Sequence, residues 1–451
     1  MKNFYKYFRV FAAVLLASLV AAQTALAAKL PVPPQITAEA AILVEASTGR
    51  VIYEKNADRL MYPASMTKMM TCLLALENWK DLSAPVTIGP EAAATEGTDF
   101  VEGDAMAMRE LLMALMMESD NGAAVAVAEA MTPSHDASEF AASMTQKAWM
   151  IGAKNTQFAN PNGLPDARHV STARDMMKIA RYGWTNKDFR KIVDAREHTL
   201  VWTTEGAQQQ RKMENTNELL YTYSGMSGIK TGWTRAAGGC LAGAATRNGV
   251  TLICIVMNAP DTTDRFKDTA KLLDYGFPLV RLAKGPVKEK IERTVWAHDG
   301  STYKVTAHPR EDVKYLLFEG DEKKKFRIDF DMPRFIRAPV KGGDKVGDLV
   351  ILYDGKEVGR IDMIADASVQ RGFSPMATVI DFYDGVLAPL FGGGHAGRNK
   401  VNRAALERGN QAAKIHVDDF ELFVGITGNQ LAHGRVKADH AGAFHVLKGW
   451  E

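Results

Sequence analysis

Three segments early in the chain place apolar residues three or four positions apart, which is the spacing of one face of a helix. These segments are 65–76, 109–117 and 121–131. The polar triplet Ser119-Asp120-Asn121 leads into the third segment, and such side chains commonly cap the start of a helix. The pattern therefore predicts three helices, the first of which starts at Ser65.

Shorter apolar runs with the length of strands flank these helices. Residues 41–44 and 51–53 stand on either side of a turn and predict a hairpin. From 229 to 257, short runs are separated by glycines and by Asn248-Gly249, a strong hairpin signal. We therefore expect residues 28–275 to form one α+β domain, in which an antiparallel sheet packs with a helical cluster.

After a boundary near 274–290 the pattern changes to strands alone. The expected strands are 303–308, 325–332 and 349–363, with a hairpin turn at Asp354-Gly355 in the last of them. They predict a small all-β domain at 290–371. Residue types that carry catalysis do not cluster in this domain.

Two segments follow the all-β domain. Residues 374–391 have the apolar spacing of an amphipathic helix, but its polar face carries Asp381 and Asp384 and no basic residue that would attract anionic lipid. Membrane contact and packing on protein are therefore both open for this helix. Residues 392–451 form a tail without a clear period, and we assign no role to it.

The first 27 residues have the layout of a secretory signal peptide. Basic residues precede the uncharged run 10–22, and Ala25-Leu26-Ala27 offers small residues for cleavage. The run is too short to span a membrane comfortably. We expect an exported mature protein that starts near Ala28 and is located in the periplasm or at the outer face of the cytoplasmic membrane.

Composition narrows the class of protein. Of 451 residues, 46% are hydrophobic and 24% are charged, which is ordinary for a globular chain of two or three domains. A formal net charge of only +2 gives no reason to expect a nucleic acid partner. The histidines form neither a His-Glu-x-x-His motif nor close pairs, so we expect no metal or other cofactor and interpret His169 as structural.

The chain has three cysteines, a small and odd number that does not indicate a disulfide framework. They are Cys72, Cys240 and Cys254. A hairpin centred on Asn248-Gly249 sets Cys254 opposite residue 243 rather than residue 240. The sequence therefore favours buried thiols over a disulfide bond.

The motif Ser-x-x-Lys is short enough to arise by chance, and it occurs three times. The matches start at Ser65, Ser227 and Ser301. Serine and lysine three positions apart share a face only on a helix, because on a strand they point to opposite sides. Only the match of Ser65 with Lys68 lies in a helical segment, so we interpret the other two as coincidences.

Two further triplets complete a set of reactive groups. They are Ser119-Asp120-Asn121 at a helix entrance and Lys230-Thr231-Gly232 at the start of a predicted strand. Together with Ser65 and Lys68 they supply a nucleophile, a base, a second hydroxyl and a cation for a substrate carboxylate. Each triplet alone has a plain structural explanation, as a helix cap or a surface charge. All three in this order, behind an export signal, predict an acyl-serine enzyme.

With these motifs the chain resembles the serine-type D-Ala-D-Ala carboxypeptidases, the low-molecular-mass penicillin-binding proteins of the penicillin-recognising acyl-serine superfamily. The likeness spans residues 40–260. Besides the three motifs it includes Thr48-Gly49-Arg50, Tyr53-Glu54-Lys55-Asn56, Pro63-Ala64, Asn160-Pro161-Asn162-Gly163-Leu164, Ser171-Thr172-Ala173-Arg174-Asp175 and Asn215-Thr216-Asn217. It implies a catalytic domain of the β-lactamase/transpeptidase type. In anchored members the amphipathic segment ends the protein, whereas here about sixty residues follow it.

The resemblance implies that Ser65 attacks the bond between the two terminal D-alanines of a peptidoglycan stem peptide and forms an acyl-enzyme. Lys68 would be the base. It must then be neutral near pH 7, which burial and the second cation Lys230 would favour by lowering its pKa. Lys230 and Thr231 would hold the terminal carboxylate of the substrate.

The remaining motif residues also take roles from the resemblance. Ser119 would relay a proton toward the leaving amine, and Asn121 would bind the substrate or orient the base. Gly232 would let the substrate backbone approach closely. The backbone N–H groups of Ser65 and Trp233 would form the oxyanion hole.

Three other functions stay open. A serine β-lactamase of the same superfamily needs a glutamate for the deacylating water, and none occurs between Glu139 and Glu197. We therefore expect β-lactams to act as covalent inhibitors that acylate Ser65 and leave slowly. An endopeptidase that cuts between stem peptides is not distinguished by the sequence. A non-catalytic wall-binding protein is disfavoured by the intact triplets.

Overall fold

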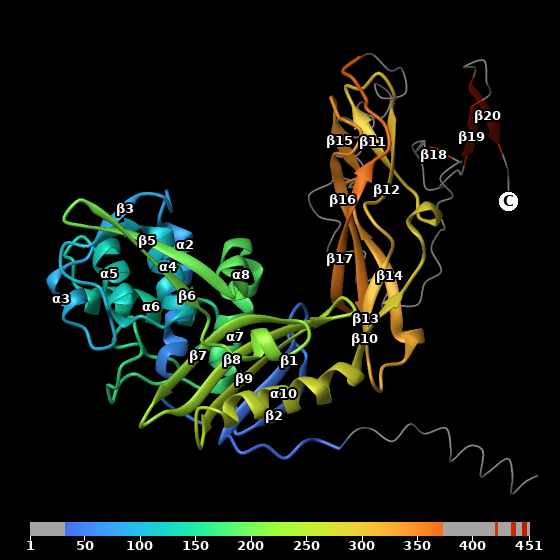
Figure 1. The fold of residues 1–451 in the computed structure, drawn as a ribbon. Coiled ribbons are helices and arrows are strands. Elements are labelled where there is room, and N and C mark those ends of the chain that lie inside the picture. Colours follow the sequence, from blue (N-terminus) through green and yellow to red (C-terminus); the bar gives the residue numbers. More distant parts are fainter. Residues whose placement is uncertain (1–31, 373–419, 423–433, 439–443, 449–451) are drawn as a thin grey trace, which may run out of the picture. The chain divides into compact units, whose positions relative to one another are not determined.

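The computed structural model describes residues 32–372 and three short strands in the tail (Figure 1). These strands are β18 Phe420–Leu422, β19 Gly434–Ala438 and β20 Phe444–Lys448, and they pair antiparallel where the sequence pattern predicted no element. The predicted signal peptide and the predicted amphipathic helix at 374–391 lie outside the described residues. Among the helices that are described, none is long and apolar enough to cross a membrane.

The described residues divide into two compact units. The first contains the chain up to Val295 together with 306–334 and 342–367, and the second contains 296–305, 335–341 and the described residues from Ser368 onward. The domain boundaries inferred from the sequence, at 28–275 and 290–371, stay predictions.

A five-stranded antiparallel sheet forms the centre of the catalytic part of the chain (Figure 1). Its strand order is β2-β1-β9-β8-β7. The strands are β1 Ala40–Glu45, β2 Val51–Lys55, β7 Met226–Thr234, β8 Gly238–Arg247 and β9 Val250–Ala259. The predicted hairpin of β1 with β2 is confirmed, and β7 is an edge strand whose outer side has no neighbouring strand in the sheet.

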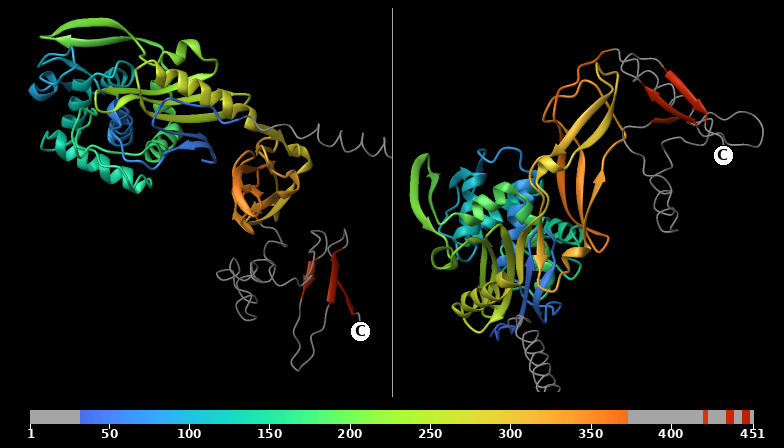
Figure 2. Two further views of the ribbon diagram at one scale, coloured as in Figure 1. Left: turned by 90° about the horizontal axis from the view of Figure 1, so that it is seen from below. Right: turned by 90° about the vertical axis from the view of Figure 1, so that its right-hand side faces the viewer.

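Alternation along the strands gives this sheet two apolar faces. On β1, Ile42 and Val44 belong to one buried cluster, whereas Ala41 and Leu43 belong to another. Because successive side chains of a strand point to opposite faces, both faces must be covered. Helix α10 covers one face, and α2 and α7 lie with the cluster on the other (Figures 1 and 2). The sheet is therefore a rigid, buried platform for its edge strand.

The turn between β8 and β9 sets the register of the sheet. Asn248 and Gly249 have φ angles of +52° and +76°, as a two-residue hairpin turn of type I′ requires. Gly243 pairs with Cys254, which is the register expected from the sequence. Cys72, Cys240 and Cys254 are buried free thiols.

Helices form most of the remaining catalytic part. They are η1 Ala64–Thr67, α2 Lys68–Asn78, α3 Pro90–Ala93, α4 Met108–Met117, α5 Asn121–Met131, α6 Ala137–Met150, α7 Ala173–Thr185, α8 Lys187–Asp194, α9 Leu219–Thr222 and α10 Asp264–Gly276. The three predicted helices are confirmed, although the first begins as the 3₁₀ turn η1. Helix α2 is buried on every side from Lys68 to Ala75, which is expected of a helix whose residues are mostly apolar.

A smaller sheet packs beside α4 and was not predicted. Its strands, in the order β3-β4-β5-β6, are β3 Pro85–Thr87, β4 Ala105–Ala107, β5 Glu197–Thr204 and β6 Ala207–Glu214. Two side-chain contacts tie the β5–β6 hairpin to the region of α4: a hydrogen bond between His198 and Glu110 at 2.8 Å and an ion pair between Arg211 and Glu118 at 2.5 Å. Glu118 directly precedes Ser119, so the hairpin supports the turn that carries this residue.

The chain beyond α10 is built from strands, as predicted. They are β10 Val280–Lys284, β11 Arg293–His298, β12 Lys304–Pro309, β13 Lys314–Phe318, β14 Phe326–Asp331, β15 Phe335–Arg337, β16 Lys345–Tyr353 and β17 Lys356–Ala365, with short 3₁₀ turns η2 Phe277–Leu279, η3 Lys288–Lys290 and η4 Lys323–Lys325. Asp354-Gly355 forms the turn between β16 and β17, which confirms the expected hairpin. The fold class, an α+β catalytic domain followed by an all-β domain, is therefore confirmed.

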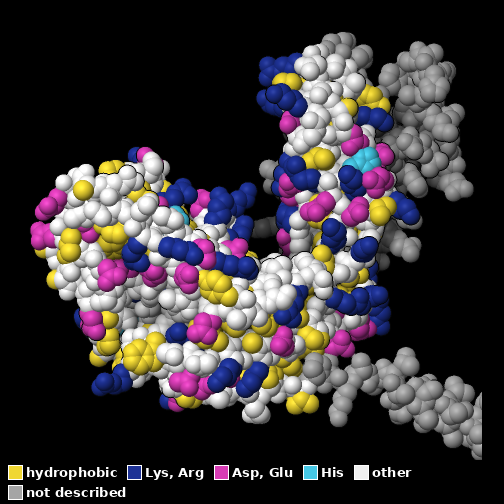
Figure 3. Space-filling view, in the orientation of Figure 1, with side chains coloured by type: hydrophobic (Ala, Val, Ile, Leu, Met, Phe, Trp, Pro, Cys, Tyr) yellow, Lys and Arg dark blue, Asp and Glu magenta, His cyan; other side chains and the backbone are white. Residues whose placement is uncertain are grey.

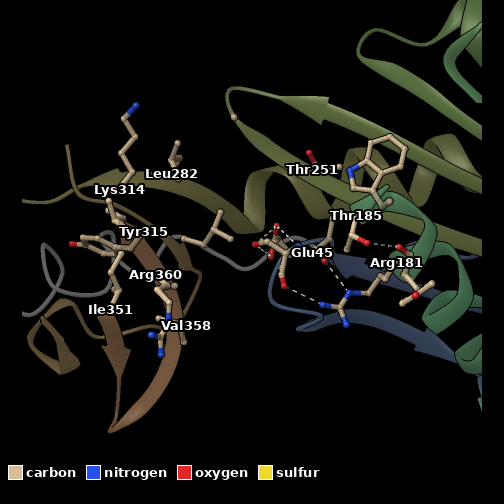
Figure 4. A pocket seen from close by; sticks show the side chains of 18 of the residues that line it. Glu45, Arg181, Thr185, Thr251, Leu282, Lys314, Tyr315, Ile351, Val358 and Arg360 are labelled. Atoms are coloured by element: carbon tan, nitrogen blue, oxygen red, sulfur yellow. Dashed lines mark hydrogen bonds between the residues drawn. The ribbon is translucent and has the colours of Figure 1, made fainter. Parts of the chain in front are cut away.

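The face of the described residues seen in Figure 3 has no extended area of one charge. In Figure 3, side chains of both signs are interspersed over the visible face, which agrees with the small formal net charge of +2. Figure 4 shows a pocket near the β1–β2 turn, where Arg181 donates to the carbonyl oxygens of Ala46 and Ser47 at 2.9 and 3.1 Å. None of the predicted site residues lines this pocket.

Candidate active site

Ser65 and Lys68 meet at the start of the buried helix. Ser65 lies in η1 and Lys68 is the first residue of α2, so the spacing of three residues places both side chains on one side. Lys68 Nζ is 3.1 Å from Ser65 Oγ. The other two Ser-x-x-Lys matches are not helical: Ser227 lies in β7, and Lys304 is the first residue of β12.

The contacts of Lys68 Nζ with three oxygen atoms are ones that a neutral amine can make. Its Nζ donates to Asn121 Oδ1 and to the carbonyl oxygen of Asn162, each at 2.7 Å. A neutral amine has two N–H groups and one lone pair. The two carbonyl-type oxygens use both N–H groups, which leaves the lone pair for the hydroxyl proton of Ser65. This arrangement suits Lys68 to receive that proton.

Burial favours the neutral form of Lys68. Lys68 is fully buried, and burial lowers its pKa to about 7, while the carboxylate of Asp120 opposes the shift. Lys68 and Lys230 are both buried, and each would disfavour a positive charge on the other, as the sequence led us to expect. The pKa of Lys230 is lowered well below its ordinary value, first by burial and then by Lys68 and Arg265.

The loop around Asn162 is a part of the site that sequence analysis did not assign. Besides the Asn162 carbonyl on Lys68, the carbonyl oxygen of Pro161 accepts from Thr71 Oγ1 at 2.6 Å. Gly163 has a φ of +89°, and a Cβ there would overlap the carbonyl oxygen of Ala64. The loop therefore packs directly on the turn that holds Ser65.

Replacing Gly163 by alanine is expected to damage both stability and activity. A positive φ costs an alanine about 1 to 3 kcal/mol, and here the overlap with Ala64 adds to that cost and displaces the Ser65 turn. Gly152 is a matched control, because it has the same φ of +89° with open space around a Cβ. Thermal unfolding and the rate of acylation by penicillin would be measured for both variants. Equal effects of G163A and G152A would contradict the packing argument.

Asn121 links the base to a neighbouring loop. Its Nδ2 donates to the carbonyl oxygen of Glu96 at 2.7 Å, which fixes the orientation of the amide and leaves Oδ1 for Lys68. Asp120 caps α5 by accepting from the N–H of Ala123 at 2.7 Å. In the second motif the aspartate therefore caps a helix, whereas the asparagine contacts Lys68.

Ser119 occupies a strained turn before α5. Its φ is +69°, which is uncommon for a residue with a side chain and places it in the left-handed region. The side chain is half-buried, and its hydroxyl makes no hydrogen bond to the described part of the chain. It is thus available to a ligand.

The third motif lies on the edge strand β7 next to Ser65. A Cβ on Gly232 would be 3.1 Å from the backbone nitrogen of Ser65, so the strand and the turn that carries Ser65 are in close contact. Lys230 and Thr231 are buried, whereas Trp233 is 53% exposed. The carbonyl oxygen of Gly232 accepts from Arg265 Nη1 at 2.8 Å. Arg265 therefore holds the backbone of this motif from inside the domain. The outer edge of β7 has no neighbouring strand in the sheet.

The structure thus connects Ser65, Lys68, Asn121 and Gly232 by direct contacts, and it adds residues that sequence analysis did not select. These additional residues are Asn162, Thr216 and Arg265. Asn162 and Thr216 stand in stretches that carried the family resemblance, which was the only signal for them. Arg265 had no signal, because it acts through a backbone oxygen that any residue could supply.

His169 is buried against Thr67, in the turn that carries Ser65. The N–H of Ala159 donates to its Nδ1 at 3.1 Å, so its Nε2 carries the proton and donates to Thr67 Oγ1 at 2.7 Å. Burial lowers the pKa of His169 to about 4, which keeps the ring neutral. These contacts are those of a structural histidine. In the described residues, no three His, Cys, Asp or Glu side chains gather as a metal site would require.

Comparison with known proteins identifies the same group that the motifs suggested. Residues 27–261 match the family described as D-alanyl-D-alanine carboxypeptidase, and residues 283–371 match the C-terminal domain of penicillin-binding protein 5. The chain is 31% identical over 346 residues to D-alanyl-D-alanine carboxypeptidase DacF of Bacillus subtilis, covering 74% of this chain and 86% of the relative. It is 30% identical over 363 residues to DacA of Escherichia coli K12, covering 76% and 86%.

Solved structures agree with these relatives. Penicillin binding protein 5 from Haemophilus influenzae aligns with a TM-score of 0.54 at 28% identity, covering 75% of this chain and 99% of that protein. The Streptomyces K15 DD-transpeptidase aligns with a TM-score of 0.53 at 32% identity, covering 55% and 100%. The chain therefore belongs to the D-alanyl-D-alanine carboxypeptidase family of serine peptidases, as its motifs predicted.

Proposed function

We propose that this protein hydrolyses the terminal D-Ala-D-Ala bond of peptidoglycan stem peptides through an acyl-enzyme on Ser65. The observation that carries the proposal is the environment of Lys68, whose Nζ is within 3.1 Å of Ser65 Oγ and donates to two carbonyl oxygens. A neutral amine in this position accepts the Ser65 proton as Oγ attacks the carbonyl carbon. Family membership supports the choice of the bond that is cut.

The tetrahedral intermediate needs donors for its oxyanion. We assign the backbone N–H groups of Ser65 and Trp233, which the close approach of Gly232 to the Ser65 nitrogen supports. Donors of this kind are typically worth about 3 kcal/mol each. As the C–N bond breaks, the proton held by Lys68 passes to the leaving D-alanine amine, with Ser119 as the relay. Water then cleaves the acyl ester and releases the shortened peptide.

Lys230 and Thr231 are proposed to hold the terminal carboxylate of the substrate. Both are buried at the open edge of β7, and burial without a bound anion disfavours the charge on Lys230. A carboxylate placed there would restore that charge, because an opposite charge favours the protonated amine.

The compartment follows from the substrate. Peptidoglycan lies outside the cytoplasmic membrane, which agrees with the export signal inferred from residues 1–27. We therefore propose a periplasmic or outer-face location, with stem peptides ending in D-Ala-D-Ala as the natural partner and β-lactams as covalent inhibitors. Membrane contact through 374–391 stays a prediction from the sequence pattern.

Penicillin is expected to acylate this protein quickly and to leave slowly. The region in which a β-lactamase would carry its deacylating glutamate has none between Glu139 and Glu197. A labelled penicillin should therefore give one adduct per protein that persists far longer than it takes to form. Rapid turnover of many penicillin molecules per protein would contradict this prediction and favour the β-lactamase alternative.

Product analysis tests the reaction itself. The mature protein would be incubated separately with a pentapeptide ending in D-Ala-D-Ala and with a cross-linked pair of stem peptides. We expect free D-alanine and tetrapeptide from the first and little cleavage of the second. Preferential cleavage of the cross-link would move the assignment to an endopeptidase. Reaction with neither peptide, together with failure to bind penicillin, would favour a non-catalytic wall-binding protein.

A further inference from the structure

The hydroxyl group of Thr216 connects two of the three motifs. Thr216 Oγ1 lies 2.8 Å from Thr231 Oγ1 and donates to the carbonyl oxygen of Met117 at 3.0 Å. Met117 is the last residue of α4, two positions before Ser119, whereas Thr231 lies on β7 beside Lys230. The Thr216 side chain therefore bridges the carboxylate-binding strand and the helix end that leads to Ser119.

Counting protons gives the direction of these hydrogen bonds. A threonine hydroxyl can donate once and accept twice, whereas a carbonyl oxygen can only accept. The Thr216 proton therefore points to Met117, and the Thr231 proton must point to Thr216. In this arrangement Thr231 has no proton left for a ligand, and its oxygen accepts from Lys230 Nζ at 3.4 Å. Because a carboxylate can only accept hydrogen bonds, Thr231 cannot bind one in this arrangement.

Met117 can release the Thr216 proton at low cost. Its carbonyl oxygen also accepts from the backbone N–H of Thr216 at 3.0 Å, so it stays hydrogen-bonded when the hydroxyl turns away. Thr216 can then donate to Thr231, and the Thr231 proton is free to turn. The change needs only rotation about two C–O bonds, and no O–H bond breaks.

We propose that Thr216 is a positioning residue for carboxylate recognition. When the terminal carboxylate of the substrate binds at Lys230, both hydroxyl groups rotate about their C–O bonds. Thr216 then donates to Thr231, and Thr231 donates to the carboxylate. A hydroxyl that accepts a hydrogen bond is a better donor, because linked hydrogen bonds polarise one another. The inference rests on the proposed function, since it requires a substrate that ends in a carboxylate.

The test compares Thr216→Val, which keeps the shape and removes the hydroxyl, with Thr216→Ser, which keeps the hydroxyl. Thr216 is exposed, so neither change opens a cavity in the core, and thermal unfolding would verify this. With a peptide ending in D-Ala-D-Ala, T216V should lower kcat/KM about fivefold, mainly through KM, because the Thr231 hydroxyl loses the donor that orients and polarises it toward the carboxylate. T216S should restore most of the activity.

Two controls separate this role from general damage. The same peptide ending in D-alaninamide lacks the carboxylate, so T216V should change its cleavage by less than about twofold. In a background of Thr231→Val, T216V should have no further effect, because Thr216 acts through Thr231. Equal losses on both peptides, additive effects of the two substitutions, or unchanged kinetics would each overturn the relay while the proposed function stands. A wild-type protein that cleaves neither peptide would overturn both.

Discussion

Replacing Ser65 by alanine is expected to abolish D-alanine release and penicillin labelling together. The change removes the only atom that forms a bond to the substrate, and loss of a serine nucleophile typically lowers kcat roughly 10⁶-fold. The fold should survive, since Ser65 is only partly buried and its Oγ is 3.1 Å from Lys68 Nζ without other side-chain partners in the described residues. Release of D-alanine from a pentapeptide would be measured for both proteins.

The chain offers a matched control for this substitution. Ser301 also precedes a lysine by three positions, but it is exposed at a bend and Lys304 lies on a strand. Ser301→Ala should therefore leave D-alanine release unchanged. A Ser65→Ala protein that keeps wild-type turnover would remove the basis of the whole assignment, whatever the behaviour of the control.

Replacing Lys68 by arginine is expected to lower the acylation rate by about 10² to 10⁴, the usual contribution of a general base. Arginine keeps a positive charge at all accessible pH values and cannot accept the Ser65 proton. The guanidinium is also larger than the amine, and Lys68 is fully buried, so a second variant, Lys68→Met, separates lost basicity from crowding. Both variants should acylate slowly, and penicillin labelling over time would measure the rate.

The pH dependence of the wild type follows from the same residue. With a pKa of about 7, Lys68 is neutral above pH 7 and protonated below it. The rate of acylation should therefore rise as pH increases through about 7 and level off above it. This rise should be absent in K68M. A wild-type acylation rate that stays constant between pH 5 and 9 would contradict the assignment of Lys68 as the base.

The local pattern predicted that Ser65 and Lys68 meet, because their contact depends only on local geometry. Ser65 and Lys68 meet wherever the intervening residues are helical, and the apolar spacing of 65–76 indicated a helix. The same reasoning set aside the Ser-x-x-Lys matches at Ser227 and Ser301, because Ser227 lies in a strand and Ser301 at a bend. For short-range chemistry of this kind, secondary structure was sufficient.

Long-range partners could not be read from the pattern. Lys68 donates to the carbonyl oxygen of Asn162, 94 residues away, and every residue has such an oxygen. The Thr216 hydroxyl meets Thr231 only because the edge strand passes the end of α4. Burial of Lys68 is likewise a property of the assembled core, so the size of its pKa shift follows from packing and not from the motif.

Several strands were missed because they are short and paired by distant partners. Strands β3, β4 and β15 have three residues each, too few for alternation to show. The hairpin of β5 with β6 is mostly exposed and rich in glutamine, so it lacks the apolar signal of a strand. Its position depends instead on the side-chain contacts with Glu110 and Glu118.

Locating the penicillin adduct tests the central claim most directly. The mature protein would be labelled briefly, digested with trypsin and sequenced by mass spectrometry. Trypsin cuts after Arg59 and Lys68, which isolates Ser65 within the peptide 60–68. The account predicts one adduct per protein, carried by this peptide and assigned by its fragments to Ser65. An adduct on any other residue, or none at all, would contradict it.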